Sequence, residues 1–481
     1  MSFASGYVRK KEYTEKVLQI GEGNFLRAFA DYLIDIMNEK NLFSGSVVLC
    51  QPIERGLCDE INAQNGLYTL VLRGIENGEI IEKSRVIESV SRCVNPYKDL
   101  ASFYNIAENP ELKIIISNTT EAGIAYSEND KVDDILNATY PGKLTKFLYE
   151  RFLHFNGDNE KGLLILPVEL IEENGKKLKD CVLKYVELWS LGDDFKKWIL
   201  ESSYFSNTLV DRIVTGFPKD DAQELYKKLG YTDSLLDTAE PFFFWAVEID
   251  QEWRKIFPAD KSGLDVIFCD DITSYKTRKV RILNGAHTVS VLGAYLSGHN
   301  IVSEMMNDEL FNKFILDTID EEIIPFINLP EKEKNDYKDA VIERFKNPFI
   351  KHNLLDISLN SVSKFKVRCL PSVLDNIKNK KFPRKLLFGL SCLIAFYEGE
   401  FSDGKYYGNR NDEKYEIRDD ITVLQFFDNI YDKENFVELI LKNKELWDVD
   451  LTAFDGVTGF VTDSVELIKT EGVKKAMELL L

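Results

Sequence analysis

Short apolar runs rich in β-branched residues alternate with helical patterns through the first half of the chain. The apolar runs are continuous rather than alternating with polar residues, so they have the character of parallel strands buried on both faces. They are residues 16–20, 46–50, 112–117 and 162–170. Between them, segments such as 24–40 and 141–155 repeat apolar residues every three or four positions, which predicts amphipathic helices. This order of strands and helices predicts a doubly wound α/β sheet.

The pattern changes near residue 270, where long helical periodicity replaces the β-rich runs. The segments 308–327 and 463–481 are examples. We therefore expect two domains, an α/β domain over residues 1–270 and a mainly helical domain over residues 271–481. The longest apolar run, residues 386–397, is about half the length that crosses a bilayer, so we predict a buried core helix there and no membrane span.

Charge and cysteine content exclude several classes of protein. The 481 residues carry a net charge of −20, which argues against nucleic acid or an anionic membrane as a partner, because either would need an accumulated positive field. An anionic ligand must therefore be held by a local basic patch. The seven cysteines are scattered without a CxxC or Cys/His cluster, and the N-terminus has no apolar signal core. We expect reduced thiols, no metal site and a cytoplasmic protein.

The segment LQIGEGNFLRAF, residues 18–29, places two glycines between the first predicted strand and the first predicted helix. In a dinucleotide-binding unit of the Rossmann type, the first such glycine makes the tight turn and the second lets the backbone approach the pyrophosphate. Here these are Gly21 and Gly23, while Leu26 stands at the position of the third glycine of the usual fingerprint. We predict that this loop binds a dinucleotide. Its residues are Leu18, Gln19, Ile20, Gly21, Glu22, Gly23, Asn24, Phe25, Leu26, Arg27, Ala28 and Phe29.

The residue at the end of the second predicted strand normally distinguishes NAD from NADP. An acid there binds the adenosine ribose and rejects a 2′-phosphate. This strand ends at Gln51, and Glu54 and Arg55 follow only later. The strand therefore leaves both cofactors open.

A helical pattern at residues 274–297 carries Lys279, Asn284 and His287 in a chain with only four histidines. At about 100° per residue, His287 lies roughly 80° and Asn284 roughly 140° round from Lys279, so one broad face presents all three. Reduction of a ketone by a nicotinamide needs an acid for the nascent alkoxide, which a lysine can supply. An amide can polarise the carbonyl and an imidazole can orient a hydroxyl. The alternative is a solvated lysine, a locally bonded asparagine and a core histidine, and spacing alone favours that alternative.

A second dyad shares the same lysine. Tyr275 and Lys279 have the Tyr-x-x-x-Lys spacing of the acid–base pair in short-chain dehydrogenases. Those proteins are much shorter, carry the pair inside the nucleotide domain and have a different glycine pattern. We therefore interpret this match as a coincidence.

The glycine loop and the lysine motif together resemble a known family. The pattern GxGxF-x-R-A after the first strand, followed by Lys-x-x-x-x-Asn-x-x-His, is similar to the zinc-independent, polyol-specific long-chain dehydrogenases of the mannitol dehydrogenase family. Residues 117–124, 206–216 and 344–352 extend the likeness over nearly the whole chain. The resemblance implies a metal-independent oxidoreductase with NAD as its cofactor. It also implies that Lys279 is the general acid/base and that Asn284 and His287 bind the reacting oxygen and its neighbours.

Within this family, residues 67–74, 166–175 and 352–371 look most like the members that reduce hexuronates. That likeness implies a small anionic sugar acid as the substrate, with a keto-hexuronate and an aldonate as the interconverted pair. The family resemblance also implies that Asp211 lies near the active site and Glu121 beside a proton path. A different hexuronate reductase and a mannitol-type polyol dehydrogenase are the alternatives within the family. A non-catalytic nucleotide-binding sensor is the alternative outside it.

Departures from the polyol-specific members fit a substrate with different polar groups. Leu170 stands where they carry a second oxyanion-stabilising asparagine, while His352 replaces an aspartate and Asp356 an arginine. A uronate carboxylate needs basic partners. The candidates are Lys364, Lys366 and Arg368, beside Lys276, Arg278 and Arg281. The alternative for SKFKVR, residues 363–368, is an alternating strand with a solvated basic face.

Overall fold

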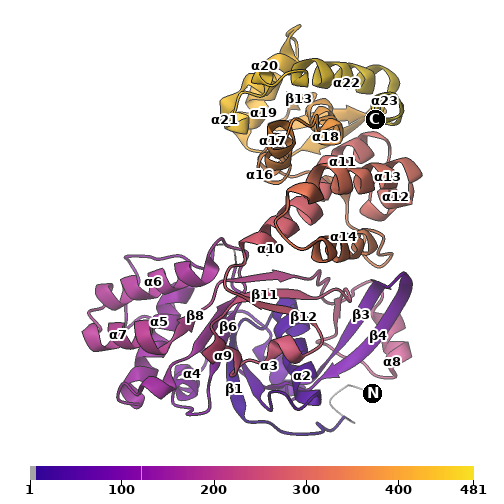
Figure 1. Ribbon diagram of the computed structural model, residues 1–481. Coiled ribbons are helices and arrows are strands. Elements are labelled where there is room, and N and C mark those ends of the chain that lie inside the picture. Colours follow the sequence, from indigo (N-terminus) through magenta and orange to yellow (C-terminus); the bar gives the residue numbers. More distant parts are fainter. Residues whose placement is uncertain (1–6, 121) are drawn as a thin grey trace. The chain divides into compact units, whose positions relative to one another are not determined.

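The computed structural model describes residues 7–120 and 122–481, which divide into two compact units. Unit 1 ends at Ile272 and unit 2 runs from Thr273 to Leu481, so the division lies two residues beyond the predicted boundary. Figure 1 shows mixed strands and helices in unit 1 and mainly helices in unit 2. The predicted fold class, an α/β domain followed by a mainly helical one, is confirmed.

The main sheet of unit 1 has six parallel strands in the order β5-β2-β1-β6-β7-β8. The strands are β1 Glu15–Ile20, β2 Ser46–Cys50, β5 Val90–Val94, β6 Ile114–Ser117, β7 Leu164–Pro167 and β8 Tyr204–Phe205. The chain order reverses at β1, which pairs with β2 on one side and β6 on the other. Open α/β sheets bind ligands at the carboxyl ends of the strands at such a switch point, so this edge positions a site.

Successive residues of the sheet strands face opposite layers. Val17 of β1 belongs to one apolar core and Leu18 to the other, as the period of two in a strand requires. One layer holds the predicted first helix, which runs without a break through α1 (Asn24–Leu26), the π-helical turn η2 (Arg27–Asp31) and α2 (Tyr32–Glu39). The other layer, seen on the opposite side of the sheet in Figure 1, holds α4 Leu100–Ala107, α5 Tyr140–His154, α6 Asn174–Leu188 and α7 Asp193–Ser202.

Two three-stranded sheets complete unit 1, in the orders β10-β3-β4 and β12-β11-β9. Their strands are β3 Tyr68–Glu76, β4 Glu79–Ile87, β9 Thr208–Asp211, β10 Asp237–Ala239, β11 Phe244–Glu248 and β12 Asp265–Cys269. The turn between β3 and β4 holds Asn77 and Gly78 at φ 54° and 81°, the left-handed conformation that a two-residue hairpin favours. Short helices in this unit are α3 Cys58–Ala63, α8 Ala222–Leu229 and α9 Gln251–Arg254.

Unit 2 is built around α18, Arg384–Phe396, which is buried from Leu386 to Phe396 and is the core helix predicted there. It crosses α11 (Gly285–Leu296) closely. A Cβ on Gly389 of α18 would lie 2.3 Å from a methyl group of Val289 of α11, so only glycine permits this approach. No helix among the described residues is long and apolar enough to span a bilayer.

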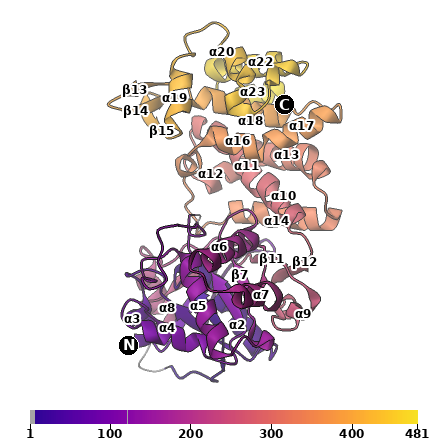
Figure 2. The same cartoon turned by 90° about the vertical axis from the view of Figure 1, so that its left-hand side faces the viewer.

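Figure 2 shows unit 2 with α11, α18 and its further helices. They are α10 Thr273–Arg278, α12 Val302–Asn307, α13 Glu309–Thr318, α14 Glu331–Phe345, α15 Leu354–Ile357, α16 Ser361–Arg368, α17 Leu370–Lys378, α19 Ile421–Asp428, α20 Phe436–Lys442, α21 Lys444–Trp447, α22 Val457–Glu471 and α23 Val473–Leu480. A small antiparallel sheet, β13 Gly399–Ser402, β14 Lys405–Arg410 and β15 Glu413–Ile417, was not predicted.

Residues 361–368 form helix α16, so the interpretation of SKFKVR as an alternating strand is wrong. The helix buries Val362 and Phe365, and the next buried apolar residue is Cys369. Spacings of three and four residues are those of an apolar helix face. The alternation of basic and apolar residues obscured this spacing in the sequence.

A buried polar network anchors the first helix next to the glycine loop. The Tyr68 hydroxyl group lies 2.8 Å from the carbonyl oxygen of Arg27 and 3.1 Å from the carboxylate of Asp31, and donates to both. Gln19 Nε2 donates to the carbonyl of Gly21 at 3.1 Å and to the Asp31 carboxylate at 3.5 Å. Burial raises the pKa of Asp31 to about 8, although the Tyr68 hydroxyl and the Arg27 charge lower it.

The raised pKa of Asp31 makes stability depend on pH in a defined direction. Between the usual pKa of 3.8 and a pH of about 8, the folded chain holds a proton that the unfolded chain releases. Stability therefore falls as the pH rises through this window, by up to about 1.4 kcal/mol per pH unit for this group. Asp31→Asn removes the ionisable group, so its melting temperature relative to the wild type should increase from pH 5 to pH 8.

The matched substitution is Asp260→Asn, which removes an exposed carboxylate from the same unit. Its melting temperature relative to the wild type should stay constant over the same range. If the difference in melting temperature between Asp31→Asn and the wild type were also constant, Asp31 would not be protonated in the folded protein.

Candidate active site

The glycine loop joins the carboxyl end of β1 to the first helix, at the switch point of the main sheet. Gly21 has φ +118°, and its amide donates to the carbonyl of Cys50 at the end of β2, at 2.9 Å. A Cβ on Gly21 would approach the carbonyl oxygen of Asn118 to 3.1 Å, so both conformation and packing demand glycine. At Gly23, no heavy atom of the described residues beyond the adjoining backbone lies within 4 Å of the place that a Cβ would take. This open space at the start of the helix fits an approaching phosphate group.

A buried carboxylate holds the neighbouring loop after β6. Glu169 accepts hydrogen bonds from the amide of Thr119 at 3.0 Å, from its hydroxyl at 3.1 Å and from the hydroxyl of Ser117 at 3.2 Å. Burial raises the pKa of Glu169, and these donors lower it. These bonds hold Ser117 and Thr119, the residues on either side of Asn118, whose carbonyl oxygen lies near Gly21.

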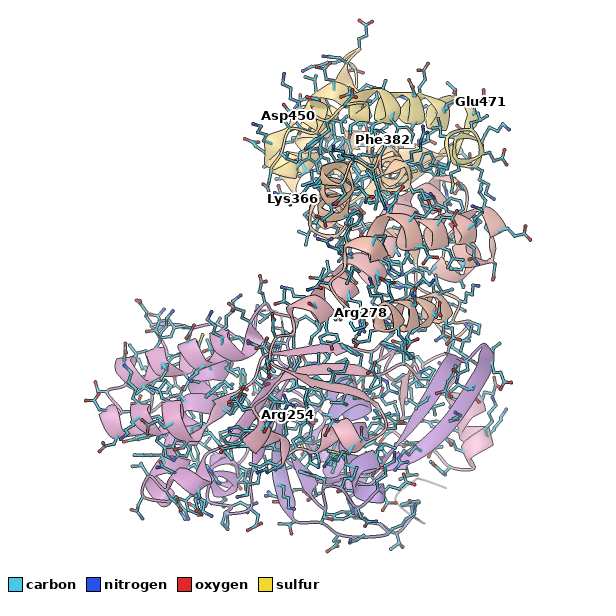
Figure 3. All side chains as sticks on the ribbon, in the orientation of Figure 1. Arg254, Arg278, Lys366, Phe382, Asp450 and Glu471 are labelled. Atoms are coloured by element: carbon cyan, nitrogen blue, oxygen red, sulfur yellow. The ribbon has the colours of Figure 1, made fainter. Side chains whose placement is uncertain are left out.

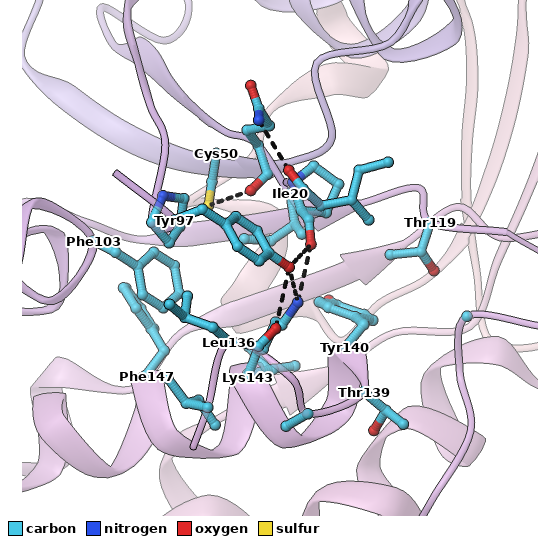
Figure 4. A pocket seen from close by; sticks show the side chains of 18 of the residues that line it. Ile20, Cys50, Tyr97, Phe103, Thr119, Leu136, Thr139, Tyr140, Lys143 and Phe147 are labelled. Carbon is cyan, nitrogen blue, oxygen red and sulfur yellow. Dashed lines mark hydrogen bonds between the residues drawn. The ribbon is translucent and has the colours of Figure 1, made fainter. Parts of the chain in front are cut away.

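An apolar cavity of about 380 Å³ opens beside these strand ends (Figure 4). Its polar corner is formed by Lys143, whose ammonium donates to the Tyr97 hydroxyl at 2.8 Å and to the carbonyl of Pro52 at 3.0 Å. Apolar side chains form much of its lining, and Gln51, Asn118 and three threonines also line it. The apolar residues include Leu18, Ile20, Leu100, Phe103, Leu136 and Phe147. Its size and lining suit a flat aromatic group.

Gln51, at the end of β2, is turned into its own loop. Its Nε2 donates to the carbonyls of Ile53 and Glu54, both at 2.9 Å, and its Oε1 accepts from the amide of Cys58 at 3.3 Å. The end of this strand therefore offers no carboxylate to a ribose, as the sequence indicated.

The predicted helix over residues 274–297 is present in unit 2 as α10, η5 (Lys279–Asn284) and α11. The segment η5 is a π-helical turn, in which the amide of Gly285 donates to the carbonyl of Val280, five residues earlier. A π turn contains more residues than an α turn, so each residue turns the chain by a smaller angle. The angle between Lys279 and Asn284 about the helix axis is therefore smaller than the 140° of a regular helix. The predicted angle is thus wrong for Asn284, and the correction favours a shared site. Such turns occur frequently at functional sites.

His287 lies in the first turn of α11 and packs against two rings. It stacks on Phe345 with 4.0 Å between ring centres and 9° between planes, and it meets His352 edge-on at 5.5 Å. Its Nε2 atom is buried and has no hydrogen-bond partner within residues 7–120 and 122–481. Burial lowers the pKa of His287 well below 6.5, and four neighbouring basic side chains lower it further. The imidazole is therefore neutral at pH 7, suited to bind a hydroxyl group rather than to supply the proton.

Those four side chains belong to unit 2 and lie near enough to His287 to act on its charge, and we call them the basic cluster. They are His352, Arg344, Arg368 and Lys364. Lys364 and Arg368 lie four residues apart on α16, so the helix presents both on one side. Burial lowers the pKa of each, and the charge of Arg368 lowers that of Lys364 further. The cluster is a local basic patch of the kind that an acidic chain needs to hold an anion.

Other basic candidates have compensating partners. The ammonium of Lys366 lies 2.7 Å from the carboxylate of Asp448, and Figure 3 shows Lys366 at the rim of unit 2. The guanidinium of Arg281 lies 2.5 Å from the carboxylate of Asp375. Arg278 is buried with its guanidinium 4.2 Å from the ring centre of Tyr337. Lys366 and Arg281 therefore add little to the field around His287.

Further site candidates lie in unit 1 or outside the described residues. Asp211 is the buried last residue of β9, and Leu170, beyond β7, is 60% exposed. Glu121 lies outside the described residues. Tyr275 lies in unit 2, not in the nucleotide unit, so the pair that it forms with Lys279 lacks the setting of a short-chain dehydrogenase.

The structure adds neighbours that the sequence did not single out. Phe345 supports the ring of His287, and Thr288 bridges α16 to α11 by accepting from Arg368 at 3.3 Å. Phe345 belongs to the segment 344–352 that carried part of the family likeness, which was an available signal. The bridge by Thr288 is a tertiary contact without a sequence signal.

Comparison with known proteins matches both units to one family. Residues 15–258 match the mannitol dehydrogenase Rossmann domain, and residues 271–469 match the mannitol dehydrogenase C-terminal domain. The altronate oxidoreductases of Escherichia coli O1:K1 / APEC and of Escherichia coli strain UTI89 / UPEC are each 42% identical to this chain over 476 residues, which cover 97% of either protein.

Two solved structures share the fold. The Pseudomonas fluorescens mannitol 2-dehydrogenase in ternary complex with NAD and D-mannitol covers 98% of this chain and 94% of its own, with 21% identity and a TM-score of 0.67. A D-sorbitol dehydrogenase in substrate-free form covers 97% of this chain and 95% of its own, with 22% identity and a TM-score of 0.82. The fold and these matches define an oxidoreductase. The chain belongs to the mannitol dehydrogenase family.

Proposed function

We propose that this chain reduces the ketone of tagaturonate to altronate with NADH, and runs the reverse oxidation with NAD. The observation that carries the proposal is the 42% identity to altronate oxidoreductases over 97% of the chain. The basic cluster around His287 supports an anionic substrate, since three of its members are concentrated within residues 352–368 of an acidic protein. The alternative substrate of the same charge and size is fructuronate.

The residues of unit 1 fit the cofactor. We propose that the backbone of residues 21–24 holds the pyrophosphate, because Gly23 leaves open space at the start of the first helix. The apolar cavity beside Tyr97 and Lys143 suits the adenine ring. When bound, the reduced nicotinamide supplies the hydride. The ternary complex of the related mannitol 2-dehydrogenase contains NAD, which supports the same cofactor here.

The residues of unit 2 carry the proton chemistry in this proposal. The Lys279 ammonium donates a proton to the substrate oxygen as the ketone carbon is reduced, and the neutral amine takes it back in the oxidation. The side-chain amide of Asn284 donates a hydrogen bond to the same oxygen and stabilises its developing charge. His287, held neutral, orients a neighbouring hydroxyl through Nε2. Asp211 and Glu121 retain the roles that the family resemblance implies, near the reacting groups and beside the proton path.

We also propose that the reaction needs no metal and takes place in the cytoplasm. A lysine ammonium and an asparagine amide supply the proton and the polarisation that a Lewis acid would otherwise provide. All seven cysteines are free thiols, which supports a reducing compartment.

The proposal is tested by NADH oxidation with tagaturonate, fructuronate and fructose, assayed with a chelator present. We expect the highest kcat/KM with tagaturonate, a lower value with fructuronate and the lowest with the neutral fructose. Preference for fructuronate would reassign the substrate, and preference for fructose would favour a mannitol-type dehydrogenase. NADH binding without turnover of any ketone would favour a nucleotide-binding sensor.

A further inference from the structure

We propose that Arg368, together with His352, binds the carboxylate of the substrate and makes the site select sugar acids over neutral sugars. This inference rests on the proposed function, because it assigns recognition of a uronate to particular residues of the same site. The proposal assigns this role to Arg368 and not to Lys366. Both are basic residues of one helix, and the sequence alone does not distinguish them.

A hydrogen bond holds the guanidinium of Arg368 next to α11. Its Nη1 donates to the hydroxyl of Thr288 at 3.3 Å, and that hydroxyl donates to the carbonyl of Asn284 at 2.9 Å. The backbone of Arg368 also lies close to α11, since a Cβ on Gly285 would lie 3.4 Å from the carbonyl oxygen of Arg368. A guanidinium has five N–H donors in a fixed fork, and one bond to a hydroxyl leaves the rest to a ligand.

Two cations of the basic cluster lack a direct acidic partner among residues 7–120 and 122–481. Neither Lys364 nor Arg368 forms an ion pair with any carboxylate that the structure describes, although 80 acidic residues are present in the sequence. The ammonium of Lys364 donates instead to the carbonyl of Ile357 at 2.8 Å. The nearby carboxylate of Asp356 lies 3.6 Å from Arg418 and accepts from Asn353 at 3.0 Å. Partly buried cations without an acidic partner favour an anionic ligand.

His352 places a second polar group beside His287. The two rings meet edge to face at 5.5 Å, and His352 is partly exposed. Burial lowers the pKa of His352, with a smaller contribution from Lys364, and Asp356 raises it. A neutral imidazole can still donate one N–H bond to a carboxylate oxygen. Arg368 and His352 therefore present donors to an anion next to the ring that orients the reacting part of the substrate.

The test compares Arg368→Gln with Lys366→Gln. The second substitution also removes one positive charge from α16, but at a residue that is paired with Asp448. For Arg368→Gln, we expect the KM for tagaturonate to rise about 10- to 100-fold, as loss of a charge-assisted hydrogen bond implies. The KM for fructose and the kcat for both substrates should change less than about threefold. Arg368→Lys should give a smaller rise in the KM for tagaturonate, because it retains the charge without the fork. Lys366→Gln should behave as the wild type.

A direct binding readout separates recognition from chemistry. Altronate and mannitol, as inhibitors, report affinity for an acid and for a neutral polyol, and Arg368→Gln should weaken only altronate. Equal weakening of both ligands, or an unchanged KM for tagaturonate in a folded Arg368→Gln, would overturn the inference. If Arg368→Gln fails to fold, unchanged selectivity in Arg368→Lys and His352→Asn would overturn it. Failure of the wild type to reduce any hexuronate would instead refute the proposed function.

Discussion

Lys279→Ala is expected to lower kcat by about 10²- to 10⁴-fold, the usual contribution of a positioned general acid. The affinity for NADH should change little, because the glycine loop belongs to unit 1 and Lys279 to unit 2. Steady-state kinetics with tagaturonate gives kcat, and quenching of protein fluorescence by NADH gives the affinity. Both measurements together distinguish lost proton transfer from lost folding.

Chemical rescue provides the control for this substitution. Alanine leaves space where the lysine side chain stood, so small primary amines added to the assay should restore part of the lost activity of Lys279→Ala. They should not accelerate the wild type. Retention of more than about a tenth of the wild-type kcat without any amine would exclude Lys279 as the general acid.

Gly23→Asp is expected to weaken NADH binding by at least about 100-fold while the chain remains folded. A Cβ at this position has no heavy atom of the described residues within 4 Å beyond its adjoining backbone, and the backbone at Gly23 has φ −69°, which any residue adopts. The new carboxylate would stand where the pyrophosphate is proposed to bind, and like charges about 4 Å apart repel by up to about 4 kcal/mol near a protein surface. Fluorescence titration with NADH measures the loss.

Gly459 offers a matched control in unit 2. It lies in α22, where a Cβ also meets nothing within 4 Å, so Gly459→Asp adds the same charge with the same freedom from clashes. Its affinity for NADH should equal that of the wild type. Unchanged binding by Gly23→Asp would show that the phosphates do not approach this glycine.

The main sheet was predictable from the sequence because its strands are buried on both faces. Continuous apolar runs such as residues 46–50 and 112–117 leave few alternatives once helical segments separate them. The antiparallel hairpins were missed. The turns Asn77-Gly78 and Asp403-Gly404 carried the usual signal, but strands such as β14 mix polar and apolar residues and lack a continuous apolar run.

Only the part of the candidate site that lies on one helix was predictable from the sequence. Lys279, Asn284 and His287 are close in sequence, so spacing alone places them on one face. The π turn that brings Asn284 nearer to Lys279 depends on the packing around it, which spacing does not reveal. The contacts of His287 with Phe345 and His352 come from the chain 58 and 65 residues later, respectively, and depend on tertiary structure.

The central claim is that this chain transfers hydride from NADH to the ketone of tagaturonate. Incubation with tagaturonate and NADH carrying two deuterium atoms at C4 tests it without regard to which face of the nicotinamide reacts. Mass spectrometry and NMR of the product should find altronate with a single deuterium on the carbon that was the ketone. NADH oxidation without deuterated altronate, or no reaction with tagaturonate, would contradict the claim.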